Sequence, residues 1–182
     1  YYSPGDIGKW WYCMTFTKPN GKRRVVVTGA GMLTALGRDW ETARNNLKAR
    51  KNFIRRMDWE NIPQMNTRLA CPYTDELPKY PRKKIRGMGR VALLSLVATQ
   101  DALKMAGFED AEGNVAEELH NGRTGIAYGS CMGSMESLSD MCSLISSGDT
   151  SRVDSQTYIK CMPQTCAANL SIYYSIRGRV IV

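Results

Sequence analysis

The 182-residue sequence predicts an α/β protein that holds only part of its sheet. Three short runs rich in β-branched and apolar residues, at 23–28, 123–130 and 179–182, have the continuous apolar pattern of strands buried on both faces of a parallel sheet. Helical patterns separate these runs, so the order is strand, helix, strand, helix, strand. The third run is reached only at the last residues, and we therefore expect an incomplete sheet layered with helices.

The composition indicates a globular protein. Hydrophobic residues make up 43% of the sequence and charged residues 23%, a balance that argues against intrinsic disorder. No apolar run reaches the roughly 18 residues of a membrane-spanning helix, so no membrane span is expected. The 25 Lys and Arg residues exceed the 17 Asp and Glu residues, and the formal net charge of +8 favours an acidic partner.

Residues 1–21 are interpreted as a leader or extension, and residues 22–182 as one domain. The leader contains turn-forming pairs such as Asn20-Gly21, shows no strand or helix period, and lacks the apolar stretch of a secretory signal. The six cysteines form no C-x-x-C pair, and the sequence has a single His. These features predict a cytoplasmic protein with reduced, mostly buried thiols and no metal site.

The first predicted strand leads into Gly29–Gly31, which we interpret as a tight turn. A glycine turn after a strand could instead cradle the pyrophosphate of a dinucleotide in a nucleotide-binding α/β module. The G-x-G-x-x-G fingerprint needs a glycine at position 34, where the sequence has Thr34, so the structural turn is favoured. After this turn, Asp39 is a good N-cap for a helix that runs through Lys48.

Residues 51–87 contain four prolines and little periodicity, which predicts a long irregular segment that is functional or rests on a partner. From Met88 to Ala106, apolar residues recur at spacings of three and four and continue almost all round the helix. This pattern predicts a buried helix, with Gly107 as the residue that ends it.

Two further helices are expected in the second half of the sequence. The first opens at Ser134 or Ser137 and ends near Gly148. The second spans 162–176, and Tyr173 lies on its apolar face. The segment between these two helices has no clear pattern.

A basic run, Pro81–Arg86, is placed by the pattern at the start of the helix that follows it. Positive charge at that end opposes the helix dipole and costs some stability, which makes a purely solvated face a less favoured interpretation than usual. A docking surface for an acidic protein or a phosphate-bearing ligand is one interpretation, and a solvated face is the other. No aromatic residues are interleaved with the run, so nucleic acid is disfavoured.

A second candidate region is the small-residue segment Gly-Ser-Cys-Met-Gly-Ser at 129–134. Small residues before a helix let a substrate approach the backbone, and Met132 would provide an adaptable wall. Cys131 has no basic neighbour that would activate it as a nucleophile, so we interpret it as a pocket or core residue. His120 stands in a polar loop and is interpreted as a surface residue.

Together these segments resemble the N-terminal half of the type I/II β-ketoacyl-acyl-carrier-protein synthases. The resemblance is carried by RRVVVTGAGMLTALG at 23–37, PRKKIRGMGRVALLSLVATQDALKMAGF at 81–108, RTGIAYGSCMGS at 123–134 and MPQTCAANLSIYYSIRGRVIV at 162–182. It implies the N-terminal portion of a thiolase-like fold. It also implies an acyltransferase that elongates acyl chains by decarboxylative Claisen condensation in fatty acid or polyene biosynthesis, without a cofactor. Two segments, NTRLA at 66–70 and YPRKKIR at 80–86, are more similar to the ketosynthases of aryl-polyene pathways than to housekeeping enzymes.

The resemblance also implies roles for individual residues. The family's nucleophilic Cys and its catalytic His residues would lie beyond Val182, so we expect no catalytic residue here and no activity of this chain alone. The residues expected to dock the acidic acyl carrier protein are Arg82, Lys83, Lys84 and Arg86, of which Lys83 and Arg86 match the family's basic positions. The expected substrate-binding residues are Cys131, Met132, Gly133 and Tyr158.

Two of these residues have more specific implied roles. Met132 matches the residue that gates the acyl pocket, and Tyr158 falls near an aromatic that reaches into the partner subunit's pocket. A homodimer, or a pair with a ketosynthase-like subunit, is therefore expected. The alternative function is a non-catalytic chain-length or partner subunit of a ketosynthase, and the nucleotide-binding module is the least favoured.

Overall fold

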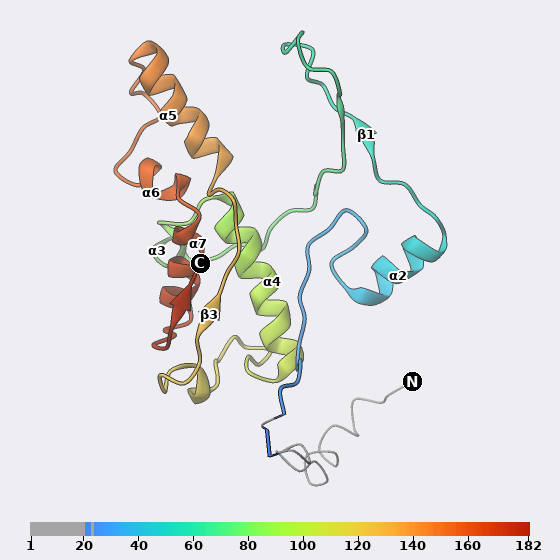
Figure 1. Cartoon of the computed structure of the whole chain (residues 1–182), viewed down its shortest axis with the longest axis vertical. Helices are drawn as coiled ribbons and strands as arrows, with labels where there is room; N and C mark the ends of the chain where they lie inside the picture. The colour runs from blue at the N-terminus through green and yellow to red at the C-terminus, as the bar shows by residue number, and fades with distance from the viewer. Residues whose placement is uncertain (1–20, 23) are drawn as a thin grey trace.

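The computed structural model describes residues 21–22 and 24–182 (Figure 1). Its elements, in order, are α2 (Trp40–Lys48), β1 (Arg55–Arg56), β2 (Leu69–Ala70), α3 (Arg82–Ile85), α4 (Arg90–Ala106), η2 (Glu117–Leu119), β3 (Ile126–Ala127), α5 (Met135–Ser147), α6 (Thr157–Cys161), α7 (Gln164–Tyr173) and β4 (Val180–Ile181). The alternation of helices with parallel strands agrees with the predicted α/β class. The predicted leader lies outside the described residues, apart from Gly21.

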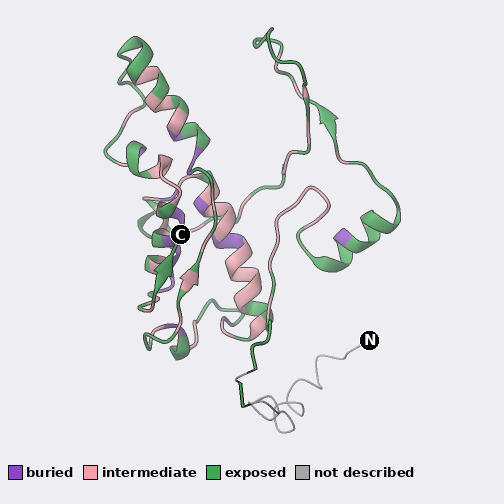
Figure 2. Ribbon diagram, viewed as in Figure 1, coloured by how far each residue is buried: buried purple, intermediate pink, exposed green. Residues whose placement is uncertain are grey.

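The core lies between α4 and α7. Each helix contributes a row of buried residues spaced by four, and the two rows pack together: Met88, Ala92 and Leu96 on one side, and Cys166, Leu170 and Tyr174 on the other. Residues four apart form a ridge along a helix, so this is the packing of one ridge against another. Figure 2 shows buried residues gathered where α4 and α7 meet. The predicted apolar face ended at Tyr173, but the ridge spacing buries Tyr174 instead, to 2% exposure.

A short parallel pair covers α7. Ile126 of β3 lies opposite Val180 of β4, and Ile126 N donates to Arg179 O at 2.8 Å. Both strands contact α7. The parallel pairing confirms that the second and third apolar runs form neighbouring strands, although each strand has only two residues. The predicted burial on both faces is wrong, because Val180 and Ile181 are 41% and 51% exposed.

The first apolar run does not form the buried strand that the sequence predicts. Within the described residues 24–28 there is no strand, and Val25 and Val27 are 94% and 91% exposed. A β-branched run becomes a strand only when a neighbouring strand supplies its hydrogen bonds. In the part of the chain that the structure describes, the two sheets contain only β1 with β2 and β3 with β4.

The tight turn predicted at Gly29–Gly31 is also wrong, because this segment is extended along α4 (Figure 1). A Cβ on Gly29 would lie 2.2 Å from Ala102 O, and one on Gly31 would lie 1.9 Å from Ala98 O. Two extended residues advance roughly 6.6 Å and four helical residues roughly 6 Å, so alternate glycines match successive helical turns. Close backbone approach to α4, rather than a turn or a pyrophosphate, accounts for these glycines.

Local capping signals are confirmed where the sequence contains them. Asp39 caps α2 by accepting from Thr42 N at 2.8 Å. Gly107 ends α4 with φ 77°, and Gly148 ends α5 with φ 71°, both in the left-handed region that favours glycine. α5 begins directly after Ser134, the first of the two predicted starts, but the Ser134 side chain makes no capping hydrogen bond.

The segment at 51–87 is largely irregular, as predicted. Its one sheet is the antiparallel pair of β1 and β2, with Arg55 opposite Ala70. Figure 1 shows α2 and this pair standing apart from the core of α4 and α7. Figure 2 shows them to be mostly exposed, and Trp40 of α2 is 69% exposed.

A buried polar network ties four segments of the core together. Tyr174 Oη donates to Glu109 Oε2 at 3.1 Å, and Gln100 Nε2 donates to Glu109 Oε1 at 2.5 Å. Tyr80 Oη in turn donates to Gln100 Oε1 at 3.0 Å. Burial raises the pKa of Tyr80 to about 12, and it raises the pKa of Tyr174 as well. The neutral phenols are therefore the forms that the folded state stabilises.

This network predicts a loss of stability between pH about 10 and pH about 12. A tyrosine in the unfolded chain loses its proton near pH 10, whereas folded Tyr80 keeps its proton up to about pH 12. Rising pH therefore favours the unfolded state across this window. Denaturant unfolding at a series of pH values should show a shallower decline for Tyr80→Phe than for the parent. Exposed Tyr158→Phe is the matched control, and parallel declines for Tyr80→Phe and the parent would contradict the expectation.

Candidate functional site

The basic run forms its own one-turn helix, α3, and not the first turn of α4 as the sequence predicts. Pro81 precedes α3, and the connection to α4 contains Gly87 and Gly89, which are poor helix formers. Arg90 is the basic residue that remains in the first turn of α4. Arg90 therefore places positive charge against the dipole of α4. The basic run itself lies on the separate helix α3.

The charged side chains of this basic helix are open to solvent. Arg82, Lys83, Lys84 and Arg86 are all exposed. The four ion pairs found within the described residues join other side chains, such as Arg38 Nε with Asp101 Oδ2 at 2.7 Å. The positive charge of the basic helix is therefore not neutralised by carboxylates in the part of the chain that the structure describes.

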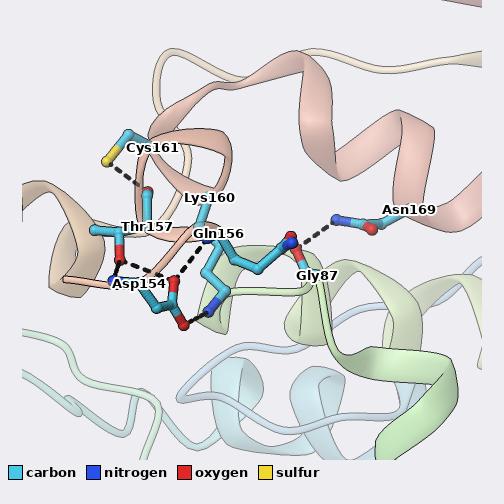
Figure 3. Close-up of polar contacts among 7 residues, drawn as sticks. All are labelled: Gly87, Asp154, Gln156, Thr157, Lys160, Cys161 and Asn169. Carbon is cyan, nitrogen blue, oxygen red and sulfur yellow. Dashed lines mark hydrogen bonds and ion pairs between the residues drawn. The ribbon is translucent and has the colours of Figure 1, made fainter. Parts of the chain in front are cut away.

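The connection after α3 is held by α7 and by the residues before α6. Asn169 Nδ2 of α7 donates to Gly87 O at 3.0 Å (Figure 3). A Cβ on Gly87 would lie 3.2 Å from Asn169 Oδ1 and 3.6 Å from Gln156 Oε1, so the backbone passes close to both amides. Neither Asn169 nor Gln156 belongs to a recognisable motif, so their role here could not be predicted from the sequence.

α6 is a five-residue helix that the sequence analysis did not predict. Asp154 Oδ1 accepts from Gln156 N at 2.8 Å and from Thr157 Oγ1 at 3.0 Å (Figure 3). These hydrogen bonds, led by the one from Gln156 N, lower the pKa of Asp154, and Lys160 Nζ lies 3.6 Å from Asp154 Oδ2. The spacing of Asp154 and Thr157 is a helix-start signal that could have located α6.

The predicted substrate turn at 129–134 packs on the end of α6. Gly133 N donates to Cys161 O at 3.0 Å, and Ser134 N donates to Lys160 O at 2.8 Å. A Cβ on Gly133 would lie 2.1 Å from Lys160 O, so this contact requires glycine. Of the four predicted substrate-binding residues, Gly133 is thus the one whose position is determined by backbone packing.

The other three predicted substrate-binding residues are exposed. Met132 is 42% exposed and Tyr158 on α6 is 60% exposed, and Cys131 is exposed beside Met132. The structure brings the turn and α6 together through Gly133, but it does not enclose Met132 or Tyr158 within the described residues. Their assignment to an acyl pocket therefore stays a prediction.

The described surface includes a narrow crevice and a larger hollow. Ser134 Oγ is buried without a hydrogen-bond partner in a narrow crevice that Gly87, Lys160 and Asn169 also line. A hollow of about 240 Å³ lies elsewhere, between the turn at 34–37 and the segment at 72–75. None of the predicted site residues lines this second hollow.

The cysteines that the structure describes are free, as predicted, but they are not mostly buried. Of the five in the described region, Cys71, Cys131 and Cys142 are exposed, because α5 and the irregular segments lie outside the core. Cys166 is buried in α7, and burial raises the pKa of its thiol, which disfavours a nucleophilic thiolate. His120 Nδ1 lies 3.3 Å from Ser175 O.

Two classes of site are not found among the described residues. No group of three or more His, Cys, Asp and Glu side chains is arranged to hold a metal ion there. No described helix has the length and apolar character to cross a membrane.

Comparison with known proteins gives a consistent result. A family model described as "Beta-ketoacyl synthase, N-terminal domain" matches residues 22–182. The crystal structure of a β-ketoacyl synthase from Burkholderia phymatum STM815 is 40% identical, with a TM-score of 0.79 over 87% of this chain and 38% of that chain. The ishigamide ketosynthase/chain length factor is 18% identical, with a TM-score of 0.68 over 88% of this chain and 40% of that chain, which is a likeness of fold alone.

Curated relatives agree with the structural neighbours. The 3-oxoacyl-[acyl-carrier-protein] synthase 1 of Haemophilus influenzae is 28% identical over 163 residues, covering 86% of this chain and 37% of the relative. Nodulation protein E of Rhizobium leguminosarum bv. trifolii is 30% identical over 164 residues, covering 87% of this chain and 38% of the relative. This chain therefore spans well under half the length of the relatives that it matches.

The packing of the turn on α6 makes a prediction for two glycines of the same segment. Gly133→Ala should destabilise the protein by about 1–3 kcal/mol, because the added methyl group overpacks against α6. Gly129→Ala is the matched control, since a Cβ there has no atom within 4 Å. The free energy of unfolding, measured by denaturant titration, should separate the two variants. Equal losses would show that the turn does not rest on α6.

Proposed function

Because the chain belongs to the β-ketoacyl synthase family and has its thiolase-like fold, we propose that the protein elongates acyl chains by decarboxylative Claisen condensation. The observation that carries this proposal is the match over residues 22–182, with 40% identity to the Burkholderia phymatum synthase. The protein would be an acyltransferase of fatty acid or polyene biosynthesis. The aryl-polyene subtype stays a prediction.

We propose that this chain contributes structural support and the docking of the carrier protein, and no catalytic residue. The resemblance places the nucleophilic Cys outside residues 22–182, and the raised pKa of Cys166 agrees with a structural role for that thiol. Without a thiolate that accepts the acyl group, these residues alone would form no covalent intermediate. We therefore infer that this chain alone is inactive.

The partner proposed for the basic helix is an acidic acyl carrier protein. Its four charged residues, Arg82, Lys83, Lys84 and Arg86, are exposed, and the formal net charge of the chain is +8. Complementary charge speeds association and selects the partner. The name of the Haemophilus influenzae relative, 3-oxoacyl-[acyl-carrier-protein] synthase 1, also contains the acyl carrier protein.

The turn at 129–134 and α6 are proposed to contribute to the acyl pocket at a subunit interface. Met132 and Tyr158 are exposed on neighbouring segments, where a second subunit could cover them. The protein would then be a homodimer, or would pair with a ketosynthase-like subunit, in the cytoplasm.

The alternative is a non-catalytic chain-length or partner subunit. The likeness to the ishigamide ketosynthase/chain length factor is one of fold and does not favour it. The relatives named as 3-oxoacyl-[acyl-carrier-protein] synthases support the enzyme instead. The nucleotide-binding alternative loses its main support, because Gly29 and Gly31 approach α4 and not a ligand.

The proposal predicts a kinetic result for the complete protein. It should convert an acyl thioester primer and malonyl-carrier protein into 3-oxoacyl-carrier protein, with release of CO₂ and of the thiol that carried the primer. The double variant Lys83→Glu with Arg86→Glu should raise KM for the carrier by roughly tenfold and leave kcat unchanged, because docking precedes the chemistry. The raised KM should also depend less on salt.

The control carries the same change of charge at exposed positions of α2 and the residues after it, Lys48→Glu with Lys51→Glu. This control should leave KM near the parent value. An unchanged KM in the docking variant would show that the basic helix is only a solvated face and does not dock the carrier. Absence of any condensation by the complete parent protein would favour the partner subunit.

A further inference from the structure

The basic helix α3 has two different faces. At roughly 100° per residue, Arg82 and Arg86 lie on one side with Lys83 next to them, while Lys84 and Ile85 lie on the other side. Arg86 continues the helical backbone, with φ −55° and ψ −37°. Ile85 is partly buried and packs against the core, which shows that its side of the helix faces inward.

Lys84 is exposed, but its side chain has a partner in α7. Its Nζ lies 5.3 Å from the centroid of the Tyr173 ring, within the range of a cation–π contact. Tyr173 also meets Tyr80 edge-on, with ring centroids 6.0 Å apart. The ring of Tyr173 therefore contacts a residue just before α3 and a residue within it.

The same face of α7 holds the segment after α3. Asn169 stands one helical turn before Tyr173, and its side-chain amide donates to Gly87 O at 3.0 Å. The contacts from Asn169 and Tyr173 thus bracket the basic helix. A one-turn helix is unstable by itself, so its position depends on contacts of this kind.

We propose that Lys84 is a positioning residue, whose contact with Tyr173 seats α3 on α7 so that Arg82, Lys83 and Arg86 face the carrier protein together. This inference rests on the proposed docking of an acidic acyl carrier protein to α3. It divides the basic run into three residues that meet the partner and one that meets the protein's own core.

The positioning role of Lys84 can be tested by replacing the Tyr173 ring and leaving every charge of the basic helix in place. Tyr173→Leu in the complete protein removes the cation–π contact and keeps all four basic residues. We expect its affinity for a purified acyl carrier protein to fall by about two- to fivefold, the range of an exposed cation–π contact. The salt dependence of binding should stay that of the parent, because no charge is lost.

Three further variants distinguish the loss of this contact from a general folding defect. Tyr173→Phe keeps the ring and should bind the carrier like the parent. Lys84→Arg keeps a cation over the ring and should also bind like the parent, whereas Lys84→Gln should lose affinity as Tyr173→Leu does. In NMR spectra of the parent, the ε-methylene protons of Lys84 should show an upfield ring-current shift that Tyr173→Leu abolishes.

The outcomes separate this inference from the proposed function. If Lys83→Gln leaves carrier binding unchanged, the docking proposal fails and takes the positioning role with it. If Lys83→Gln weakens binding and flattens its salt dependence while Tyr173→Leu binds like the parent, docking stands and the positioning role of Lys84 is overturned. Loss of affinity in Tyr173→Leu, with rescue in Tyr173→Phe and an unchanged salt dependence, supports both.

Discussion

The contact on which the rest of the structure depends is the packing of two ridges between α4 and α7. Because both rows repeat every four residues, each helix presents a continuous apolar edge to the other, and Leu96 and Leu170 lie at the buried contact. Each helix then uses a second face. α4 accepts the backbone of Gly29 and Gly31, and α7 carries the β3–β4 pair and the basic helix. The almost uniformly apolar pattern of α4 follows from this use on more than one side.

The elements that could be predicted from the sequence are those specified by local chemistry. Asp39 begins a helix and Gly107 ends one through hydrogen bonds and backbone angles that involve only neighbouring residues. The run at 23–28 failed as a strand because a strand needs a partner, which no pattern within the run can supply. Gly29–Gly31 was misread for the same kind of reason, since the constraint on these glycines comes from α4, some seventy residues away.

The candidate site shows the same division. Exposure of the basic run followed from its charge, but its separation from α4 depended on Gly87 and Gly89, and its anchoring depends on Asn169, which carries no sequence signal. Gly133 was singled out for the room it leaves a substrate, whereas its contact is with the backbone of α6. A helix as short as α6 depends on Asp154, which accepts hydrogen bonds from Gln156 N and Thr157 Oγ1 at the start of the helix, and on the turn that packs on its end. Such short elements rarely have a hydrophobic period of their own.

The central claim is that the α4–α7 contact is the most stable part of this chain. Native-state hydrogen exchange of the 182-residue chain tests it most directly, because it gives an opening free energy for each amide. We predict that the amides of Leu96, Val97 and Leu170 exchange last, with the highest opening free energies, and that the amides of α2 exchange through much smaller local openings. Equal protection of α2 and α4, or earlier exchange at Leu96 than in α2, would contradict the account.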